Sequence, residues 1–197
     1  MEQRAGNSIF AAAFDTSSPP AGVMVRRLFS DASKVSLYDK GETTRPAIAG
    51  SLYQKVWVVF LDMVDGADLL PIVVTEFLGP LFNLIIFYVD LAPSTGAPTA
   101  LLVDSLVVAV VFTSKASHSS PMMQWLHTVL LSQPEYIALQ DSLFAGQLHG
   151  PHNFITDGLT RSREREVESV MRHLGMTMER VDVPGRCLAI LTAAVQR

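Results

Sequence analysis

The chain has little cysteine and little charge, and both shortages narrow its class. Cys187 is the one cysteine among 197 residues, so no internal disulfide can form, and there is no Asn-x-Ser/Thr sequon. Both absences favour an intracellular, cytoplasmic protein over a secreted one. Charged residues make up 17% of the chain and hydrophobic residues 49%. This composition excludes a disordered chain, a collagen-like repeat and a disulfide-stabilised scaffold.

A basic excess is also missing. The formal net charge is −4, which gives no general positive field to attract a phosphate backbone. We therefore expect no nucleic-acid partner. Residues 26–30 (RRLFS) resemble a mitochondrial presequence cleavage site, but the acidic residues Glu2 and Asp15 precede them, and presequences are poor in acidic residues. A mitochondrial location is the alternative to the cytoplasm.

Common catalytic and nucleotide-binding motifs are absent. The sequence has no Gly-x-Ser-x-Gly, no Walker A motif and no Gly-x-Gly-x-x-Gly. Cys187 stands at the start of an apolar run, which is typical of a buried cysteine rather than a nucleophile. His149 and His152 are separated by Gly-Pro with no nearby cysteine or carboxylate, so we expect two exposed loop histidines rather than a closed metal site.

The charge that is present lies mostly at the two ends of the chain. Residues 46–153 contain ten charged residues among 108, roughly 9%, against about 25% in typical globular proteins. A deeply buried core, a membrane segment, or an apolar surface covered by a partner would each explain this charge-poor middle.

The membrane explanation rests on residues 69–89, which have spanning length and one charge, Glu76. Pro71, Gly79 and Pro80 interrupt this stretch, and aspartates rather than lysine or arginine flank it. We therefore expect no membrane insertion. A membrane-associated protein is kept as an alternative.

Hydrophobic patterning predicts an alternation of strands and helices. Strands are expected over 8–14, 22–29, 55–64, 83–91, 101–113 (a strand or a buried helix), 176–183 and 186–195, the last two as a hairpin. Helices are expected over 69–79, 121–132, 134–148 and 160–174, and a mobile loop near 30–50. Together they predict an α/β fold: a mixed, largely buried β-sheet with helices on both faces, with α+β as the alternative. At this length a single domain over 1–197 is expected.

The densest acidic group is Asp62, Asp65 and Asp68, at the end of the predicted strand 55–64. Carboxylates at such a strand end can bind Mg²⁺, because hard cations prefer oxygen ligands and the edge of the sheet opens into a crevice. Asp-Gly is also a common turn, and Asp68 could cap the helix that follows. We take these three residues as the candidate metal ligands, and Mg²⁺ as the one cofactor to consider.

Two functions follow from these observations. Because catalytic motifs are absent and apolar residues abundant, the first is a noncatalytic protein–protein interaction or assembly subunit that buries its charge-poor surface against a partner or a second copy. The alternative is an Mg²⁺-dependent enzyme acting on a small phosphorylated substrate at a strand-end carboxylate cluster.

Overall fold

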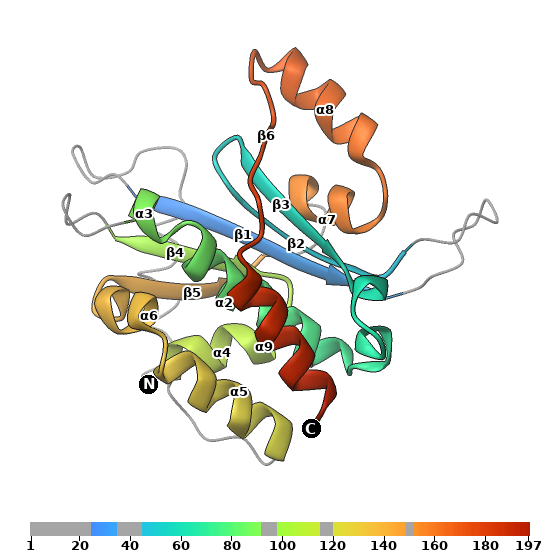
Figure 1. Cartoon of the computed structure of the whole chain (residues 1–197). Helices are drawn as coiled ribbons and strands as arrows, with labels where there is room; N and C mark the ends of the chain where they lie inside the picture. The colour runs from blue at the N-terminus through green and yellow to red at the C-terminus, as the bar shows by residue number, and fades with distance from the viewer. Residues whose placement is uncertain (1–24, 35–44, 92–97, 115–119, 149–151) are drawn as a thin grey trace.

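A mixed sheet runs through the middle of the protein, with helices on both of its faces (Figure 1). The computed structural model describes residues 25–34, 45–91, 98–114, 120–148 and 152–197. In these residues the sheet has six strands in the order β5-β4-β1-β2-β3-β6. The strands are β1 (Arg26–Ser33), β2 (Ala47–Leu52), β3 (Lys55–Phe60), β4 (Thr99–Val103), β5 (Leu143–Gln147) and β6 (Glu179–Arg180). The expected α/β class is confirmed.

The sheet combines an antiparallel meander with parallel strands. β1, β2 and β3 pair antiparallel in sequence order, while β4 pairs parallel to β1 and β5 parallel to β4. In the β1–β4 pair Ser30 lies opposite Val103. The carboxyl ends of β1 and β4 therefore meet at one end of the sheet, where side chains that follow the strands can share a site.

The helices form two layers of unequal size (Figure 1). The larger layer contains α2 (Ile72–Ile86), α4 (Leu106–Ser114), α5 (Pro121–Leu131), α6 (Pro134–Leu139) and α9 (Gly185–Val195). On the other face α7 (Phe154–Thr160) packs on β1 and β2, and α8 (Glu164–His173) packs on α7. The described residues also form three short elements, namely the 3₁₀ helices η1 (Leu61–Met63) and η2 (Ala67–Leu69) and the helical turn α3 (Tyr88–Leu91).

Helix α2 is the centre of the hydrophobic core. Every residue from Phe77 to Ile85 is buried, because the sheet covers one side of the helix and α4, α5, α6 and α9 contact it elsewhere. A helix that is apolar on all sides must be covered on all sides. The charge-poor middle is thus largely the protein's own core. No helix in the described ranges combines the length and apolarity needed to cross a membrane.

One side chain links α2 to two strands. Asn83 is fully buried, its Oδ1 accepts a 2.8 Å hydrogen bond from Trp57 Nε1, and its Nδ2 donates a 2.8 Å hydrogen bond to the Phe29 carbonyl. The glycine at position 50 leaves room for both side chains, because a Cβ there would lie 2.6 Å from the Trp57 ring and in collision with Asn83.

The predictions for the apolar middle were partly wrong. The predicted strand 83–91 is helical, formed by the end of α2 and by α3, so the predicted parallel crossover through 55–64, 69–79 and 83–91 does not exist. The predicted helix 69–79 begins later, at Ile72, and continues through Pro80. Residues 101–113 divide into β4 and α4. Runs that are apolar on every side show neither the strand nor the helix period, so periodicity could not separate the two.

The C-terminal half also differs from expectation. The helix expected over 134–148 is α6 followed by strand β5, and the expected hairpin is β6 followed by α9. The helix expected over 160–174 is confirmed as α8 (Glu164–His173). Helix 121–132 is confirmed as α5, with proline at its first position. Residues 186–195, predicted as a strand, belong to helix α9, which packs on η2 and α2, so tertiary contacts overrode local β-propensity there.

The expected loop near 30–50 is wrong at both ends. β1 continues to Ser33 and β2 begins at Ala47, so both ends of the expected loop are strand, and residues 35–44 lie outside the described residues. The predicted strand 22–29 overlaps β1, which begins and ends four residues later, at Arg26 and Ser33. The predicted strand 8–14 lies outside the described residues. Small and polar side chains in β1 and β2 hid these two central strands from a hydrophobicity pattern.

Candidate functional site

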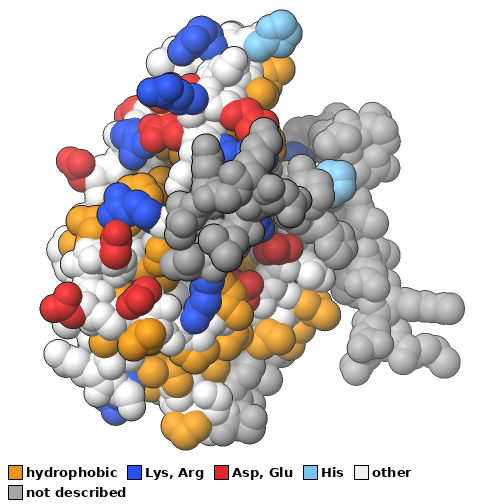
Figure 2. Space-filling view, turned by 90° about the vertical axis from the view of Figure 1, so that its right-hand side faces the viewer, with side chains coloured by type: hydrophobic (Ala, Val, Ile, Leu, Met, Phe, Trp, Pro, Cys, Tyr) orange, Lys and Arg blue, Asp and Glu red, His pale blue; other side chains and the backbone are white. Residues whose placement is uncertain are grey.

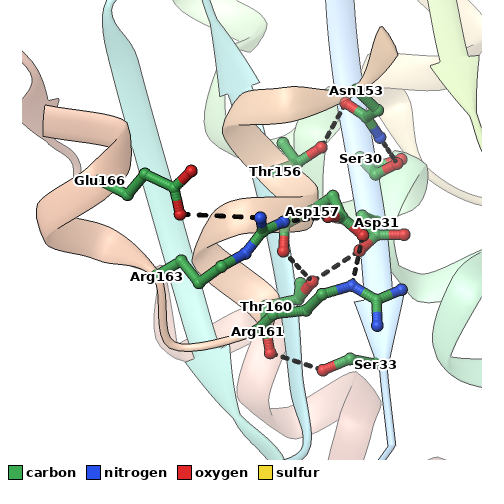
Figure 3. A network of polar contacts seen from close by, with 10 residues as sticks. All are labelled: Ser30, Asp31, Ser33, Asn153, Thr156, Asp157, Thr160, Arg161, Arg163 and Glu166. Atoms are coloured by element: carbon green, nitrogen blue, oxygen red, sulfur yellow. Dashed lines mark hydrogen bonds and ion pairs between the residues drawn. The ribbon is translucent and has the colours of Figure 1, made fainter. Parts of the chain in front are cut away.

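Helix α7 is attached to the central strand β1 mainly by polar side chains (Figure 3). Asn153 Nδ2 donates a 3.0 Å hydrogen bond to the Ser30 carbonyl, and Ser33 Oγ donates a 2.6 Å hydrogen bond to the Thr160 carbonyl. All four residues are buried. The apolar cluster beneath α7 is small and centres on Leu159. Buried hydrogen bonds of this kind fix the position of α7 on β1.

Asp31 is the most unusual residue of this interface. It lies on β1 with 7% of its surface exposed, and its Oδ2 accepts a 2.6 Å hydrogen bond from Thr160 Oγ1. Burial, reinforced by the negative charges of Asp157 and Asp104, raises the pKa of Asp31 from 3.8 to about 6, although the Thr160 hydrogen bond and Arg161 act in the opposite direction. A carboxylate held in so unfavourable a place is typical of a functional site.

Asp104 and Glu76 extend the acidic group. Because Ser30 pairs with Val103, Asp31 and Asp104 occupy the next position along two adjacent parallel strands. Glu76 comes from the first half of α2, and both Asp104 and Glu76 are half-buried. Burial, together with the charge of Asp104, raises the pKa of Glu76, while a hydrogen bond to the Ser105 side chain lowers it.

Asp157 contributes the fourth acidic side chain, from α7. Its Oδ1 accepts from Arg161 Nε at 2.5 Å and its Oδ2 from Arg163 Nη2 at 2.5 Å, so that both carboxylate oxygens are paired (Figure 3). Arg163 Nη1 also lies 3.7 Å from Glu166 Oε2. Ser162, between the two arginines, has a φ of 58°, in the left-handed region that is unfavourable for a serine. This strained turn allows both arginines to reach back to one aspartate.

The four acidic side chains come from β1, α2, the end of β4 and α7. The charges of Asp157 and Asp104 act on Asp31, and the charge of Asp104 also acts on Glu76. Figure 2 views the side of the molecule toward which β1 points in Figure 1; acidic and basic side chains are interspersed over its upper part, and hydrophobic ones gather lower down. Carboxylate oxygens are the ligands that hard divalent cations prefer, but Asp31, Asp157 and Glu76 each already have a hydrogen-bond partner within the protein.

The predicted metal ligands Asp62, Asp65 and Asp68 lie elsewhere, in and between η1 and η2. All three are exposed. Asp62 accepts hydrogen bonds of 2.8 and 2.6 Å from Nε and Nη2 of Arg45, and this pairing lowers the pKa of Asp62. Asp68 does not cap α2, which begins after Pro71. A metal role for these three residues stays a prediction.

In the parts of the chain that the structure describes, no three His, Cys, Asp or Glu side chains are arranged so that they could hold a metal ion together. This applies both to the predicted group and to the group around Asp31. Around Asp31 the reason is visible, because Thr160 engages Asp31 while two arginines engage Asp157.

Sequence reasoning missed the group around Asp31 because its members are spread over 127 positions, from Asp31 to Asp157. A usable signal did exist. Asp104 directly follows the short apolar stretch that forms β4, and strand-end carboxylates were the type of residue sought. The close spacing of the three aspartates at 62–68 drew attention to the wrong group.

Comparison with known proteins gives little further information. No protein-family model and no curated protein matches the sequence. Among solved structures, the Prototype Foamy Virus Protease-Reverse Transcriptase (native) resembles this chain with a TM-score of 0.35 and 12% sequence identity, over 71% of this chain and 20% of that one. The matched part is about a fifth of that protein's length, and a match of this strength supports no statement about function.

Proposed function

We propose that the protein is a divalent-cation-dependent enzyme that acts on a phosphate ester at Asp31, Glu76, Asp104 and Asp157. The observation that supports this function is the burial of Asp31 beside the negative charges of Asp157 and Asp104, the second of which also acts on Glu76. This arrangement costs the folded protein free energy, and a bound cation would offset that cost.

The position of the group in the fold supports the same proposal. Ligands of α/β proteins commonly bind outside the carboxyl ends of parallel strands. Asp104 directly follows β4, and Asp31 lies on the adjacent strand β1, two residues before its end. A divalent cation, if held by these carboxylates, would supply a Lewis acid for the phosphoryl oxygens and would lower the pKa of a bound water. Glu76, half-buried and with a raised pKa, is suited to accept a proton from that water.

The experiment measures thermal unfolding with and without Mg²⁺ or Mn²⁺, and the cation-dependent hydrolysis of a nitrophenyl phosphate monoester and diester. We expect the cation to raise the melting temperature of the wild-type protein, and one of the esters to be hydrolysed. Asp31→Asn and Asp104→Asn should lose both effects. Asp62→Asn is the matched control, because it removes one carboxylate of the alternative group and should change neither. Loss of the cation effect in Asp62→Asn but not in Asp31→Asn would refute the proposed site.

A second candidate is the noncatalytic interaction or assembly subunit, with a second copy of the chain as the partner. The observation that favours it is the exposure of Leu106, Val107 and Val110 on α4, at 59%, 50% and 47%. They lie within one turn of each other on the helix surface. Light scattering after size exclusion should then show a dimer that Val107→Asp converts to a monomer, and a wild-type monomer would contradict it.

A further inference from the structure

We propose that the outer edge of β3 around Val58 binds an extended basic segment of another protein, which joins the sheet there as a further strand. This surface is separate from the acidic group around Asp31, because β2 lies between β3 and β1 in the sheet. Binding of the segment therefore does not depend on a cation at that group.

Strand β6 covers only the first part of the outer edge of β3. The last hydrogen bond between the two strands runs from Val181 N–H to the Val56 carbonyl, at 2.8 Å. β3 continues beyond this point, with its inner edge paired to β2. Alternate residues of a strand direct their N–H and C=O groups to the same edge, so Val58 is the next residue after Val56 to face outward. No segment in the described residues pairs with it, and an unpaired strand edge is a ready template for another strand.

A cavity of about 290 Å³ opens beside this unpaired edge. Residues 56–59 of β3 form one side of its lining and residues 180–183 another, with Met63 and Leu188. Strand addition gains affinity from main-chain hydrogen bonds and specificity from pockets that receive alternate side chains. The cavity supplies such a pocket next to Val58, and the valines and Leu188 in its lining suit an aliphatic side chain of the incoming strand.

The unneutralised charges around the cavity are negative. Asp182 belongs to its lining, and Asp65 lies between η1 and η2, two positions after a lining residue. Both aspartates are exposed, and neither forms an ion pair within the described ranges. Arg180 of the lining and Arg45, which lies over the Phe60 ring, are each paired with an acidic side chain. This edge therefore favours a segment that carries lysine or arginine.

The probe is a fluorescein-labelled peptide of alternating lysine and valine, and its binding to the full chain is measured by fluorescence anisotropy. Two control peptides have the same length. One carries glutamate in place of lysine, and the other is N-methylated at every residue, so that its backbone cannot donate hydrogen bonds. We expect the lysine peptide to bind and both controls to bind at least about tenfold more weakly. No binding of the lysine peptide, or equal binding of the N-methylated one, would overturn the proposal.

Variants of the chain test where the peptide binds. Combining Asp65→Asn with Asp182→Asn should weaken binding about fivefold. Asp141→Asn is the control, because Asp141 is exposed and lies just before β5, at the opposite edge of the sheet; equal weakening by this variant contradicts the proposed site. Val58→Pro should abolish binding, because it removes the outward N–H, which β2 does not use. Circular dichroism verifies that this variant is folded.

Amide hydrogen exchange, measured by NMR, tests strand addition at the backbone itself. At a peptide concentration about ten times its dissociation constant, exchange of the Val58 N–H should slow about tenfold. Exchange of the Ala145 N–H, on the outer edge of β5, should not change. Unchanged exchange at Val58 would refute strand addition there. A dimeric wild type in which Val58 is protected without peptide would refute it as well, because a second copy would then occupy the edge.

Discussion

Replacing Asp31 by asparagine tests whether this carboxylate is kept at the expense of stability. The substitution retains the size of the side chain and an oxygen that can accept the hydrogen bond of Thr160 Oγ1, now 2.6 Å from Asp31 Oδ2. What it removes is the charge. Because Asp31 is 7% exposed, that charge is held largely out of water.

The magnitude follows from the pKa of Asp31. Folding raises this pKa from 3.8 to about 6, and a pKa difference of one corresponds to about 1.4 kcal/mol. Below about pH 4 the carboxyl is protonated in both states and costs nothing. As the pH rises toward the folded pKa, Asp31 is already ionised in the unfolded protein but still protonated in the folded one, so the free energy of unfolding falls. Above about pH 7 the ionised Asp31 therefore destabilises the folded protein by about 3 kcal/mol.

The assay is urea unfolding of both proteins between pH 4 and pH 8, without divalent cations. We expect Asp31→Asn to unfold with about 3 kcal/mol more free energy than the wild type at pH 8 and with an equal free energy near pH 4. In thermal unfolding at pH 8, the gain corresponds to roughly 6–12 °C. Mg²⁺ should narrow the difference by stabilising the wild type alone. An Asp31→Asn protein that is no more stable than the wild type at pH 8 would refute the reasoning.

Two further predictions concern the core. Gly50→Ala should lower the free energy of unfolding in urea by about 1–3 kcal/mol, because its Cβ would lie 2.6 Å from the Trp57 ring. Gly185→Ala is the control and should leave the free energy of unfolding unchanged, because no atom lies within 4 Å of the new Cβ. Equal effects of the two substitutions would contradict the packing described for α2. Cys187 is buried, and burial raises the pKa of its thiol to about 12, so iodoacetamide at pH 8 should leave the native protein unmodified and label it only after unfolding in urea, as mass spectrometry would show.

Some elements could be predicted because their signals are local. Helix α5 begins with proline, and its buried residues Met123, Leu126 and Leu130 recur at helical spacing. The run of apolar residues in strand β3 correctly predicted that the strand begins at Lys55. In both cases a few neighbouring residues carry the information that decides the conformation.

Other elements could not be predicted because the deciding contacts are distant. Residues 83–86 are helical since α2 is covered on all sides by the sheet and by helices that come much later in the chain. Their sequence, NLII, would suit a buried strand equally well. The proline at position 80 marked a false helix end, because burial of the helix outweighed the hydrogen bond that a proline cannot donate.

The sequence by itself determined an α/β fold with a mixed sheet covered on both faces, because the apolar content of residues 46–153 requires a large core. Only the tertiary structure decided where the acidic side chains meet. Asp31, Glu76, Asp104 and Asp157 are far apart along the chain, and the parallel pairing of β1 with β4 and the packing of α2 and α7 on β1 bring them to one end of the sheet. Their mutual repulsion and burial exist only in the folded protein, and this is why spacing along the sequence could not reveal them.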